Sequence, residues 1–399
     1  MSASGLSPAR LRRLRDVLSR HVESGTMPGL VALVARRGEV HVETIGTMET
    51  GGTEPMRRDT IFRIASVTKQ VAAAAAMTLV EECRLQLDNP VHDLLPELAN
   101  RQVLTRLDAP LDETAPARRP ISLRDLLTFV FGLGAIMAEP GRYPIQRAME
   151  EAGLGPGAES PPVEPDEWMK RLGSLPLAYQ PGEKWLYHTG SDVLGVLMAR
   201  ATGRPLPEVL AERVLEPLGM TDTGFYVPEG SLHRLPAAYR PDPATGGLLL
   251  SDDPRDSLWG RPPAFPSAGG GLVSTADDLL AFCTMMLNKG RHGAGRILSR
   301  PTVELMTTDL ITERQKAENA IFFGGNSGWG LGFQVFLRRT TLASTPGRFG
   351  WTGGTGTAVY TDPREELIGI LLTQREMTSP EPPNVYRDFW TGTYQAIDD

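Results

Sequence analysis

The spacing of apolar residues predicts a helix, a hairpin and a second helix in the first part of the chain. Residues 8–22 place apolar side chains at helical intervals among arginines, which predicts an amphipathic surface helix. Residues 30–35 and 40–45 read as two strands joined at Arg37-Gly38. Residues 66–82 predict a helix, and its middle, 71–80, is apolar on every side. We therefore expect that helix to be buried all round.

The pattern changes between about residues 88 and 266, where proline and glycine become frequent. Residues 132–165 resemble a mobile inserted loop, and Gly269-Gly270-Gly271 marks the end of this part. Ser191-Asp192 is expected to cap one of its helices at the N-terminal end. Short helices are predicted at residues 123–128, 165–172, 192–201 and 206–215.

The C-terminal part returns to strands and closes the predicted fold. A helix at 274–288 precedes strands at 332–337, 356–360 and 367–373, and a last helix covers 383–397. Because strand patterns occur at both ends, we expect one antiparallel sheet built from both termini, with a helical subdomain between them. The predicted division is an α/β domain of residues 1–75 together with 267–399 and a helical, loop-rich subdomain of residues 76–266. The active site is expected in the cleft between them.

Charge and composition narrow the class of protein. The 399 residues include 41 Lys and Arg against 48 Asp and Glu, a net charge of −7, which argues against a protein that coats nucleic acid. The apolar run 71–80 is too short to span a bilayer, and the polar, Arg-rich N-terminus lacks a secretory signal. The two cysteines fit a reducing compartment. We therefore expect a cytoplasmic globular protein that binds neither nucleic acid nor a membrane.

Several common catalytic motifs are missing from the sequence. It contains no Gly-x-Ser-x-Gly elbow, no P-loop, no dinucleotide-binding glycine pattern and no His-Glu-x-x-His. The six histidines show no metal-ligand spacing, and the two cysteines make no zinc site. The sequence therefore implies neither a metal nor an organic cofactor.

Ser66 and Lys69 are the first candidates for catalysis. A serine is a weak nucleophile unless a neighbouring base or charge favours its alkoxide. Lys69 follows one helical turn later on the same face, and Ser66 stands at the start of the helix, where the dipole favours negative charge. A lysine that leads into a buried segment is costly without a partner. The alternative is an N-cap serine with a solvated lysine, although Lys69 cannot close a capping box.

Tyr187 is the second candidate. It stands on the connection into the helix predicted from Asp192, with its ring free to face a cleft. A tyrosine near a lysine can be shifted toward phenolate and act as a base. The alternative is that Trp185 and Tyr187 are aromatic core residues. In an extended run His188 points to the opposite side from Tyr187, so we expect a structural or supporting role for His188.

The glycine-rich stretch 350–356 is the third candidate. Dense glycine in a strand lets another backbone or a ligand approach closely. A strand edge can also offer a backbone N–H to an oxyanion. The alternative is a glycine-rich bulge without a ligand.

In this order and at these intervals, the three features resemble the serine β-lactamase-like family, and more narrowly its class C β-lactamase-related esterases (family VIII-type carboxylesterases). The family's Ser-x-x-Lys motif matches Ser66 and Lys69. Its Tyr-x-Asn motif matches Tyr187, with Thr189 in place of the asparagine. The resemblance extends to residues 87–91, 125–128, 217–220 and 271–275 and so spans most of the chain.

The third motif and one further segment set this chain apart within the family. The motif reads Lys-Thr-Gly in the lactamases and often Trp-x-Gly or His-x-Gly in the esterases, and Trp351-Thr352-Gly353 matches the Trp form. Thr189 and Trp351 thus replace the two residues that hold the amide and carboxylate of a β-lactam, which puts lactamase activity in doubt. A family segment, Leu-Leu-Thr-His-Thr-Ser-Gly-Leu, is more apolar here and includes Phe131. We expect that wall of the cleft to favour apolar substrates.

The resemblance implies an α+β fold of the β-lactamase/transpeptidase-like type, with an antiparallel sheet flanked by helices and an all-helical subdomain. It implies a serine hydrolase that cleaves short-chain or small hydrophobic acyl esters through an acyl-enzyme on Ser66. Lys69 and Tyr187, treated as one coupled pair, take the serine proton, and Tyr187 then protonates the leaving alcohol. The backbone N–H groups of Ser66 and Gly354 form the oxyanion hole. The substrate-binding residues implied are Trp351, Gly353, Thr189 and Phe131.

Other activities on the same Ser-Lys-Tyr machinery remain alternatives. A β-lactamase and a D-amino-acid peptidase or amidase usually act outside the cytoplasm on cell-wall-like substrates. An acyltransferase differs only in the acceptor that reaches the acyl-enzyme. The alternative outside enzymes is an inactive binding protein on this scaffold, against which the joint presence of Ser66, Lys69 and Tyr187 argues. The expected partner is a small-molecule ester, and the sequence indicates no oligomeric state.

Overall fold

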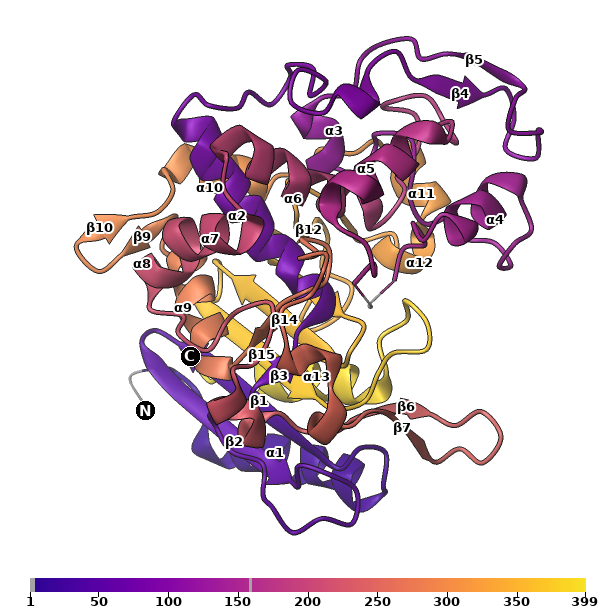
Figure 1. Ribbon diagram of the computed structural model, residues 1–399. Helices are drawn as coiled ribbons and strands as arrows, with labels where there is room; N and C mark the ends of the chain where they lie inside the picture. Colours follow the sequence, from indigo (N-terminus) through magenta and orange to yellow (C-terminus); the bar gives the residue numbers. More distant parts are fainter. Residues whose placement is uncertain (1–3, 158–159) are drawn as a thin grey trace.

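A seven-stranded antiparallel sheet forms the base of the computed structural model, which describes residues 4–157 and 160–399 (Figure 1). Its strand order, β11-β12-β13-β14-β15-β1-β2, joins strands from both ends of the chain. The expected antiparallel sheet is therefore confirmed. The strands are β1 (Gly29–Arg36), β2 (Glu39–Gly46), β11 (Ser327–Trp329), β12 (Gln334–Phe336), β13 (Phe349–Gly353), β14 (Thr357–Asp362) and β15 (Leu367–Thr373).

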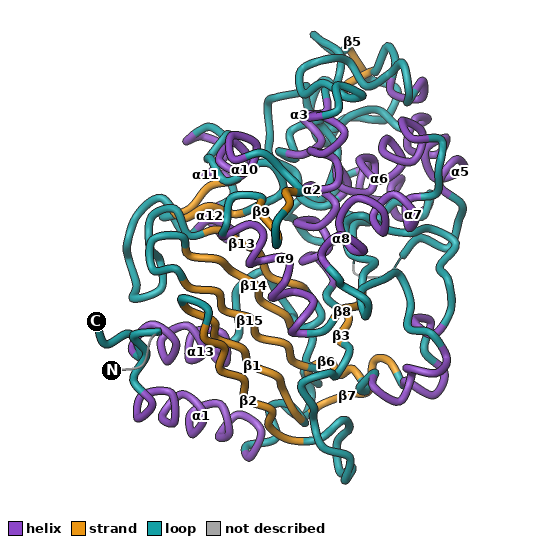
Figure 2. The backbone as a smooth tube through the Cα atoms, turned by 90° about the vertical axis from the view of Figure 1, so that its left-hand side faces the viewer, coloured by secondary structure: helices purple, strands orange, loops and turns teal. Residues whose placement is uncertain are grey.

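Helices cover the sheet and build a second region above it in the view of Figure 1. α1 (Pro8–Glu23) and α13 (Asn384–Gln395) lie side by side over one face, and α9 (Ala276–Leu287) packs on β14 and β15 (Figure 2). α2 (Thr68–Glu81) joins the sheet to the helical region. The other helices are α3 (Leu123–Leu127), α4 (Pro144–Glu151), α5 (Pro165–Ser174), α6 (Thr189–Thr202), α7 (Leu206–Leu210), α8 (Glu216–Leu218), α10 (Arg300–Met306), α11 (Glu313–Glu318) and α12 (Ala320–Phe323).

Short strand pairs complete the described chain. Each is an antiparallel pair outside the main sheet, and the pair of β3 and β8 lies directly before α2 and α9. The pairs are β3 (Phe62–Arg63) with β8 (Val273–Ser274), β4 (Gln102–Leu104) with β5 (Thr114–Pro116), β6 (Ala238–Pro241) with β7 (Leu248–Asp252), and β9 (Arg291–His292) with β10 (Gly295–Arg296).

Strand β1 is apolar throughout because its two faces meet two different cores. Successive side chains of a strand point to opposite faces. Leu30 and Val34 therefore pack with α1 and α13, whereas Val31 and Leu33 pack with α2 and α9. Burial on both sides explains why this strand shows a continuous apolar run rather than an alternating one.

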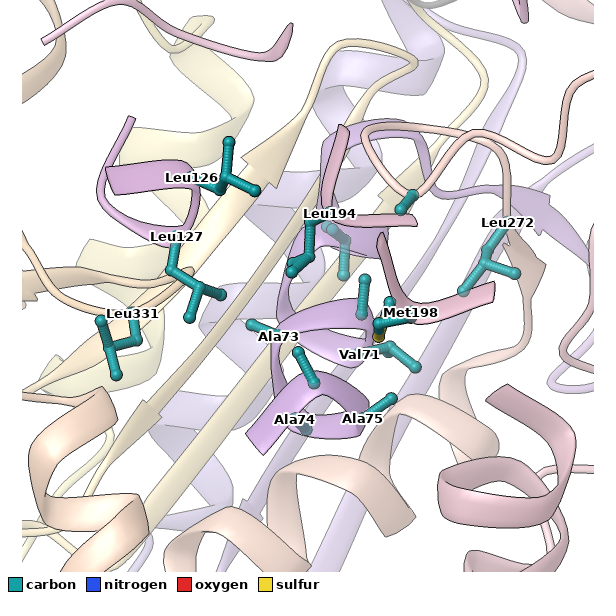
Figure 3. Close-up of a cluster of buried hydrophobic side chains, with 14 of the residues drawn as sticks. Val71, Ala73, Ala74, Ala75, Leu126, Leu127, Leu194, Met198, Leu272 and Leu331 are labelled. Carbon is teal, nitrogen blue, oxygen red and sulfur yellow. The ribbon is translucent and has the colours of Figure 1, made fainter. Parts of the chain in front are cut away.

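Helix α2 is buried along almost its whole length, as its all-round apolar pattern predicts. Residues 68–79 are all buried. The small side chains of Ala73, Ala74 and Ala75 let neighbouring elements approach closely, and Figure 3 shows them among leucines from α3, α6 and the segment before β8. The central helix that begins beside Ser66 is thus fixed from all sides, which gives the site a rigid support.

The helical region differs from the prediction at several points. Residues 132–165, expected to be a loop, contain α4. The helix predicted at 206–215 consists of α7 and a π-helical turn over residues 211–215. The predicted division after residue 75 falls inside α2, and α10, α11 and α12 of the C-terminal part lie among the upper helices (Figure 1). The boundaries of the two domains stay a prediction.

None of the helices in residues 4–157 and 160–399 has the length and apolarity needed to cross a membrane.

Candidate active site

Ser66 lies on a strained turn between β3 and α2. Residues 65–67 form a 3₁₀ turn, and Ala65 has a φ of 40°, which residues other than glycine rarely adopt. Thr357 Oγ1 donates to the Ile64 carbonyl at 3.1 Å and so ties the turn to β14. Ser66 is half-buried while its neighbours are buried, and the N-cap residue of α2 is Val67. Ser66 is therefore presented to the surface of a cavity rather than used as a helix cap.

Lys69 is a buried lysine whose Nζ contacts Ser66. Its relative exposure is 1%, and Nζ donates to Ser66 Oγ at 3.0 Å and to the carbonyl of Gly269. Burial lowers the pKa of Lys69 to about 7, and the nearby Asp192 carboxylate acts in the opposite direction. A solvated lysine is therefore excluded, and near neutral pH a large share of Lys69 is a neutral amine that can accept a proton.

Tyr187 faces the same two residues. Lys69 Nζ lies 4.6 Å from the centre of the Tyr187 ring. The Tyr187 hydroxyl accepts a hydrogen bond from Trp351 Nε1 at 2.5 Å and also hydrogen-bonds Ser66. Burial raises the pKa of Tyr187 above its ordinary value, and the two hydrogen bonds only partly offset that effect. At neutral pH the residue is a phenol, which can donate a proton.

His188 also meets Lys69, so the expectation that it points away from Tyr187 is wrong. His188 has φ 81° and ψ −67°, and the Thr189 N–H donates to the Tyr187 carbonyl at 3.3 Å. These are the features of a γ-turn of the rare, positive-φ type. Such a turn breaks the alternation of an extended chain, so His188 Nδ1 lies 3.2 Å from Lys69 Nζ.

Asp192 is a further buried residue of the site, in addition to Lys69 and His188. The sequence pattern predicts instead that it caps a helix. Helix α6 begins at Thr189, with His188 as the N-cap residue, so Asp192 lies in the first turn of the helix. Its carboxylate lies 3.1 Å from His188 Nε2 and accepts hydrogen bonds from Ser267 Oγ at 2.7 Å and from the Gly269 N–H at 3.0 Å. The signal that could have found the pair is the i,i+4 spacing of a histidine and an aspartate directly after Tyr187.

The glycine-rich segment brings β13 against the turn that carries Ser66. A Cβ at Gly353 would overlap the Ile64 carbonyl and Thr357 Oγ1, so only glycine fits there. Gly354 follows at the end of the strand, lines the cavity beside Ser66, and its carbonyl accepts from the Met377 N–H at 2.7 Å. The backbone of this segment therefore comes close to the turn that carries Ser66, and binding of a ligand there stays a prediction.

A cavity of about 370 Å³ opens over Ser66. Tyr187, Trp351 and Gly354 form part of its wall, and none of the lining residues within the described chain is charged. Apolar side chains dominate the remainder, which suits an uncharged ligand. The apolar lining comprises Ala135, Met137, Ile321, Phe322, Met377, Pro380 and Pro382.

Three expected substrate-binding residues are not among those that line this cavity. Phe131 is fully buried in the main hydrophobic core, and Thr189 is buried, with no hydrogen-bond partner for its Oγ1 among the described residues. Gly353 instead packs against the Ile64 carbonyl. Trp351 does line the cavity, and it additionally donates to Tyr187. Arg348, a cation close to the third motif in sequence, is buried against Trp390 and does not reach the cavity.

The described residues contain no cluster of three or more His, Cys, Asp or Glu side chains that could hold a metal ion. Polar contacts at the site are instead made between Ser66, Lys69, Tyr187, His188 and Asp192 themselves.

Comparisons with known proteins match nearly the whole chain. The Beta-lactamase family model matches residues 14–388. Protein Rv1367c of Mycobacterium tuberculosis is 41% identical over 362 residues, which cover 88% of this chain and 87% of that protein. Esterase EstB of Burkholderia gladioli is 31% identical over 399 residues, with 94% of each chain covered. Among solved structures, EstCE1, "a hydrolase with promiscuous acyltransferase activity", has a TM-score of 0.81 and 26% identity, and the match covers 97% of this chain and 99% of that one.

Proposed function

Because this chain belongs to the beta-lactamase family, we propose that it is a serine hydrolase that cleaves carboxylic esters through an acyl-enzyme on Ser66. The observation that carries the proposal is the 3.0 Å contact between Lys69 Nζ and Ser66 Oγ at the floor of an uncharged cavity. A buried amine beside a serine hydroxyl is the arrangement that activates a serine nucleophile. The names of EstB and of a lovastatin esterase from Penicillium rubens, 29% identical to this chain, support ester substrates.

The proposed reaction begins with attack of Ser66 Oγ on the ester carbonyl carbon. The serine proton passes to the coupled pair of Lys69 and Tyr187, and the lowered pKa of Lys69 favours its amine as the first acceptor. The carbonyl oxygen becomes an oxyanion held by the N–H groups of Ser66 and Gly354. Tyr187, a phenol at neutral pH, protonates the departing alkoxide and recovers its proton from Lys69. Water then attacks the acyl-enzyme, which releases the acid and restores Ser66.

The cavity supports a neutral substrate with a small hydrophobic acyl group. Among the described residues, its lining offers no charged partner for a carboxylate. The resemblance of the third motif places the Trp351 indole where the lactamase members carry a lysine. The apolar wall expected from Phe131 is supplied instead by Met137, Ile321 and Phe322. A small-molecule ester is accordingly the proposed partner, and a cytoplasmic location stays a prediction.

Acyl transfer is the second candidate, because EstCE1 is described as a hydrolase with promiscuous acyltransferase activity. Transfer requires only that an alcohol, rather than water, attacks the acyl-enzyme, and an apolar cavity can hold such an alcohol. Analysis of products formed from p-nitrophenyl acetate in the presence of a short alcohol separates the two outcomes. A new ester indicates transfer, whereas acetate alone indicates hydrolysis.

The experiment that tests the proposed function compares the wild-type protein with Ser66→Ala. We expect the wild type to hydrolyse p-nitrophenyl acetate and to carry an acetyl group on Ser66 after rapid quenching, as measured by peptide mass spectrometry. The variant should keep the wild-type melting temperature within a few degrees and lose turnover. If the purified variant kept more than a few per cent of wild-type turnover, Ser66 would not be the nucleophile.

A further inference from the structure

We propose that His188, held by Asp192, is a positioning residue that orients the Lys69 amine toward Ser66. This inference rests on the proposed function, since it concerns how the general base of that reaction is aimed. Lys69, His188 and Asp192 are buried, and each lies within hydrogen-bond distance of the next. Together with Ser66, which Lys69 contacts, they join α2 and α6, two elements that are far apart in sequence.

The protonation state of Lys69 decides how many hydrogen bonds it can donate. An ammonium group has three N–H donors, whereas a neutral amine has two N–H bonds and one lone pair. Within the described part of the chain, Lys69 Nζ meets three partners: Ser66 Oγ at 3.0 Å, His188 Nδ1 at 3.2 Å and the Gly269 carbonyl. In the ammonium form, all three partners accept hydrogen bonds from Nζ. In the neutral amine, if His188 and Gly269 accept the two N–H bonds, the lone pair has to face Ser66 Oγ. Ser66 is also the partner whose O–H carries the proton to be removed.

This orientation depends on the tautomer of His188, and Asp192 fixes that tautomer. A carboxylate can only accept hydrogen bonds, so His188 Nε2, which lies 3.1 Å from Asp192 Oδ2, carries the ring proton. Nδ1 then presents its lone pair to Lys69. Asp192 is itself held by Ser267 Oγ and the Gly269 N–H. One short segment, 267–269, therefore holds both Asp192 and, through the Gly269 carbonyl, Lys69.

Burial favours the neutral form of His188. The titratable side chains that face one another are Lys69 of α2, Tyr187 and His188 before α6, and Asp192 within α6. Burial lowers the pKa of His188, the Lys69 charge adds to this, and Asp192 opposes both. Although burial tends to raise the pKa of Asp192, interactions with His188 and Ser267 keep it below its ordinary value. A neutral imidazole between a carboxylate and an amine is the state that the orientation requires.

Backbone geometry at two positions supports the same role. The φ of 81° at His188 belongs to a conformation that costs free energy in a residue other than glycine, and such strain gathers at functional sites. A Cβ at Gly269 would lie 2.9 Å from His188 Nε2 and 3.0 Å from Asp192 Oδ1, so glycine lets segment 267–269 close over the pair. The strained backbone at His188 thus places this imidazole beside Lys69.

The decisive variant is Asp192→Asn. Its amide can donate to His188 Nε2, which favours the tautomer with a proton on Nδ1 and turns the Lys69 lone pair away from Ser66. We expect kcat for p-nitrophenyl acetate to fall by roughly a hundredfold or more, while KM stays within about threefold. Loss of the Asp192 carboxylate removes a charge that stabilises the Lys69 ammonium, so the acid limb of the kcat/KM profile should move to lower pH. In ¹⁵N-histidine NMR, the His188 proton should move from Nε2 to Nδ1.

His188→Asn provides rescue by a conservative residue. Asparagine tolerates positive φ, and its Oδ1 can take the place of Nδ1 as the acceptor for Lys69. We expect it to keep kcat within about tenfold of the wild type, well above Asp192→Asn. Asp278→Asn is the matched control, because Asp278 is a buried carboxylate that accepts from Thr223 Oγ1 at 2.8 Å and from the Asp222 N–H at 2.9 Å, away from the cavity. It should lower the melting temperature without moving the pH profile.

The results separate this inference from the proposed function. A wild-type protein without hydrolysis of neutral esters would count against the function alone, and the NMR experiment would still test His188. A wild-type spectrum with the proton on Nδ1 would overturn the inference. So would Asp192→Asn if it folds, keeps kcat within about threefold of the wild type and leaves the acid limb in place.

Discussion

Lys69 is chemically unusual because of where it is buried. Enclosure by α2, α6 and segment 267–269 removes the water that would stabilise an ammonium, so the pKa of Lys69 falls to about 7. The same enclosure raises the pKa of Tyr187. One burial effect thus gives the site a proton acceptor and a proton donor at neutral pH.

The pH dependence of the reaction should follow Lys69. Because the base works only after losing its proton, we expect kcat/KM for a neutral ester to rise with pH through about 7 and then to level off. Tyr187 stays protonated over this range. Initial rates measured at low substrate concentration across the pH range give the profile. An acid limb near the ordinary lysine pKa, above about 10, would contradict the assignment of Lys69 as base.

Lys69→Ala and Tyr187→Phe should each lower turnover by roughly three or more decades, the scale seen when one member of a catalytic unit is removed. Both residues contact Ser66 and each other, so we expect the double variant to be little worse than either single variant. A double-mutant cycle on kcat, with melting temperatures as a check on folding, measures this. If the two losses simply add in free energy, the residues act independently.

At the scale of elements, the site depends on how closely β13 approaches the turn before α2. Gly353 faces the Ile64 carbonyl without space for a side chain, and Thr357 of the next strand binds that same carbonyl. Strand and turn therefore fix the position of Ser66 relative to Gly354, and with it the two N–H groups of the proposed oxyanion hole.

Gly353→Ala should separate these two elements. The added methyl group overlaps backbone, which cannot move away as a side chain can, so we expect a loss of stability of about 1–3 kcal/mol and a lower kcat. Gly354→Ala is the matched control for stability, since a Cβ there meets nothing within 4 Å. Thermal unfolding of both variants decides the point. Equal melting temperatures would show that β13 is free to move.

At the scale of the whole molecule, the cavity combines segments from distant parts of the chain. Three distant segments supply its apolar wall around Ser66, through Ala135, Met137, Ile321, Phe322, Met377, Pro380 and Pro382. Although the chain contains 41 Lys and Arg, none of them lines the cavity within the described residues, and Arg348 stacks on Tyr360 and Trp390 instead. A carboxylate that entered this cavity would lose its water without gaining a charged partner.

Specificity should follow from that lack of charge. We expect kcat/KM for p-nitrophenyl butyrate to exceed that for the β-lactam nitrocefin by at least about two decades, or ~3 kcal/mol of transition-state binding. Kinetics with both substrates on one preparation test this. Comparable values would mean that another group holds the carboxylate and that the protein is a β-lactamase with esterase side activity.

The sequence alone determined the parts of the molecule that depend on local pattern. The apolar runs of the sequence predict α2 and the strands β1, β14 and β15, and these elements are buried along most of their length. The helical spacing of its apolar residues predicts α1. Ser66 and Lys69 could be paired because one helical turn separates them. Tyr187 could be added because the order of the three motifs resembles a known family.

The contacts of His188 and Asp192, and the set of side chains that line the cavity, depend on how the chain folds. The role of His188 depends on the φ of one residue, and a γ-turn leaves no periodic signal in sequence. From the sequence, Asp192 resembles a helix-capping residue, and its contact with segment 267–269 forms only in the folded chain. From the sequence, Phe131 is expected in the cleft wall, whereas in the folded chain it lies in the main hydrophobic core. Contacts between residues far apart in the chain settle each of these cases, and a local pattern carries no information about such contacts.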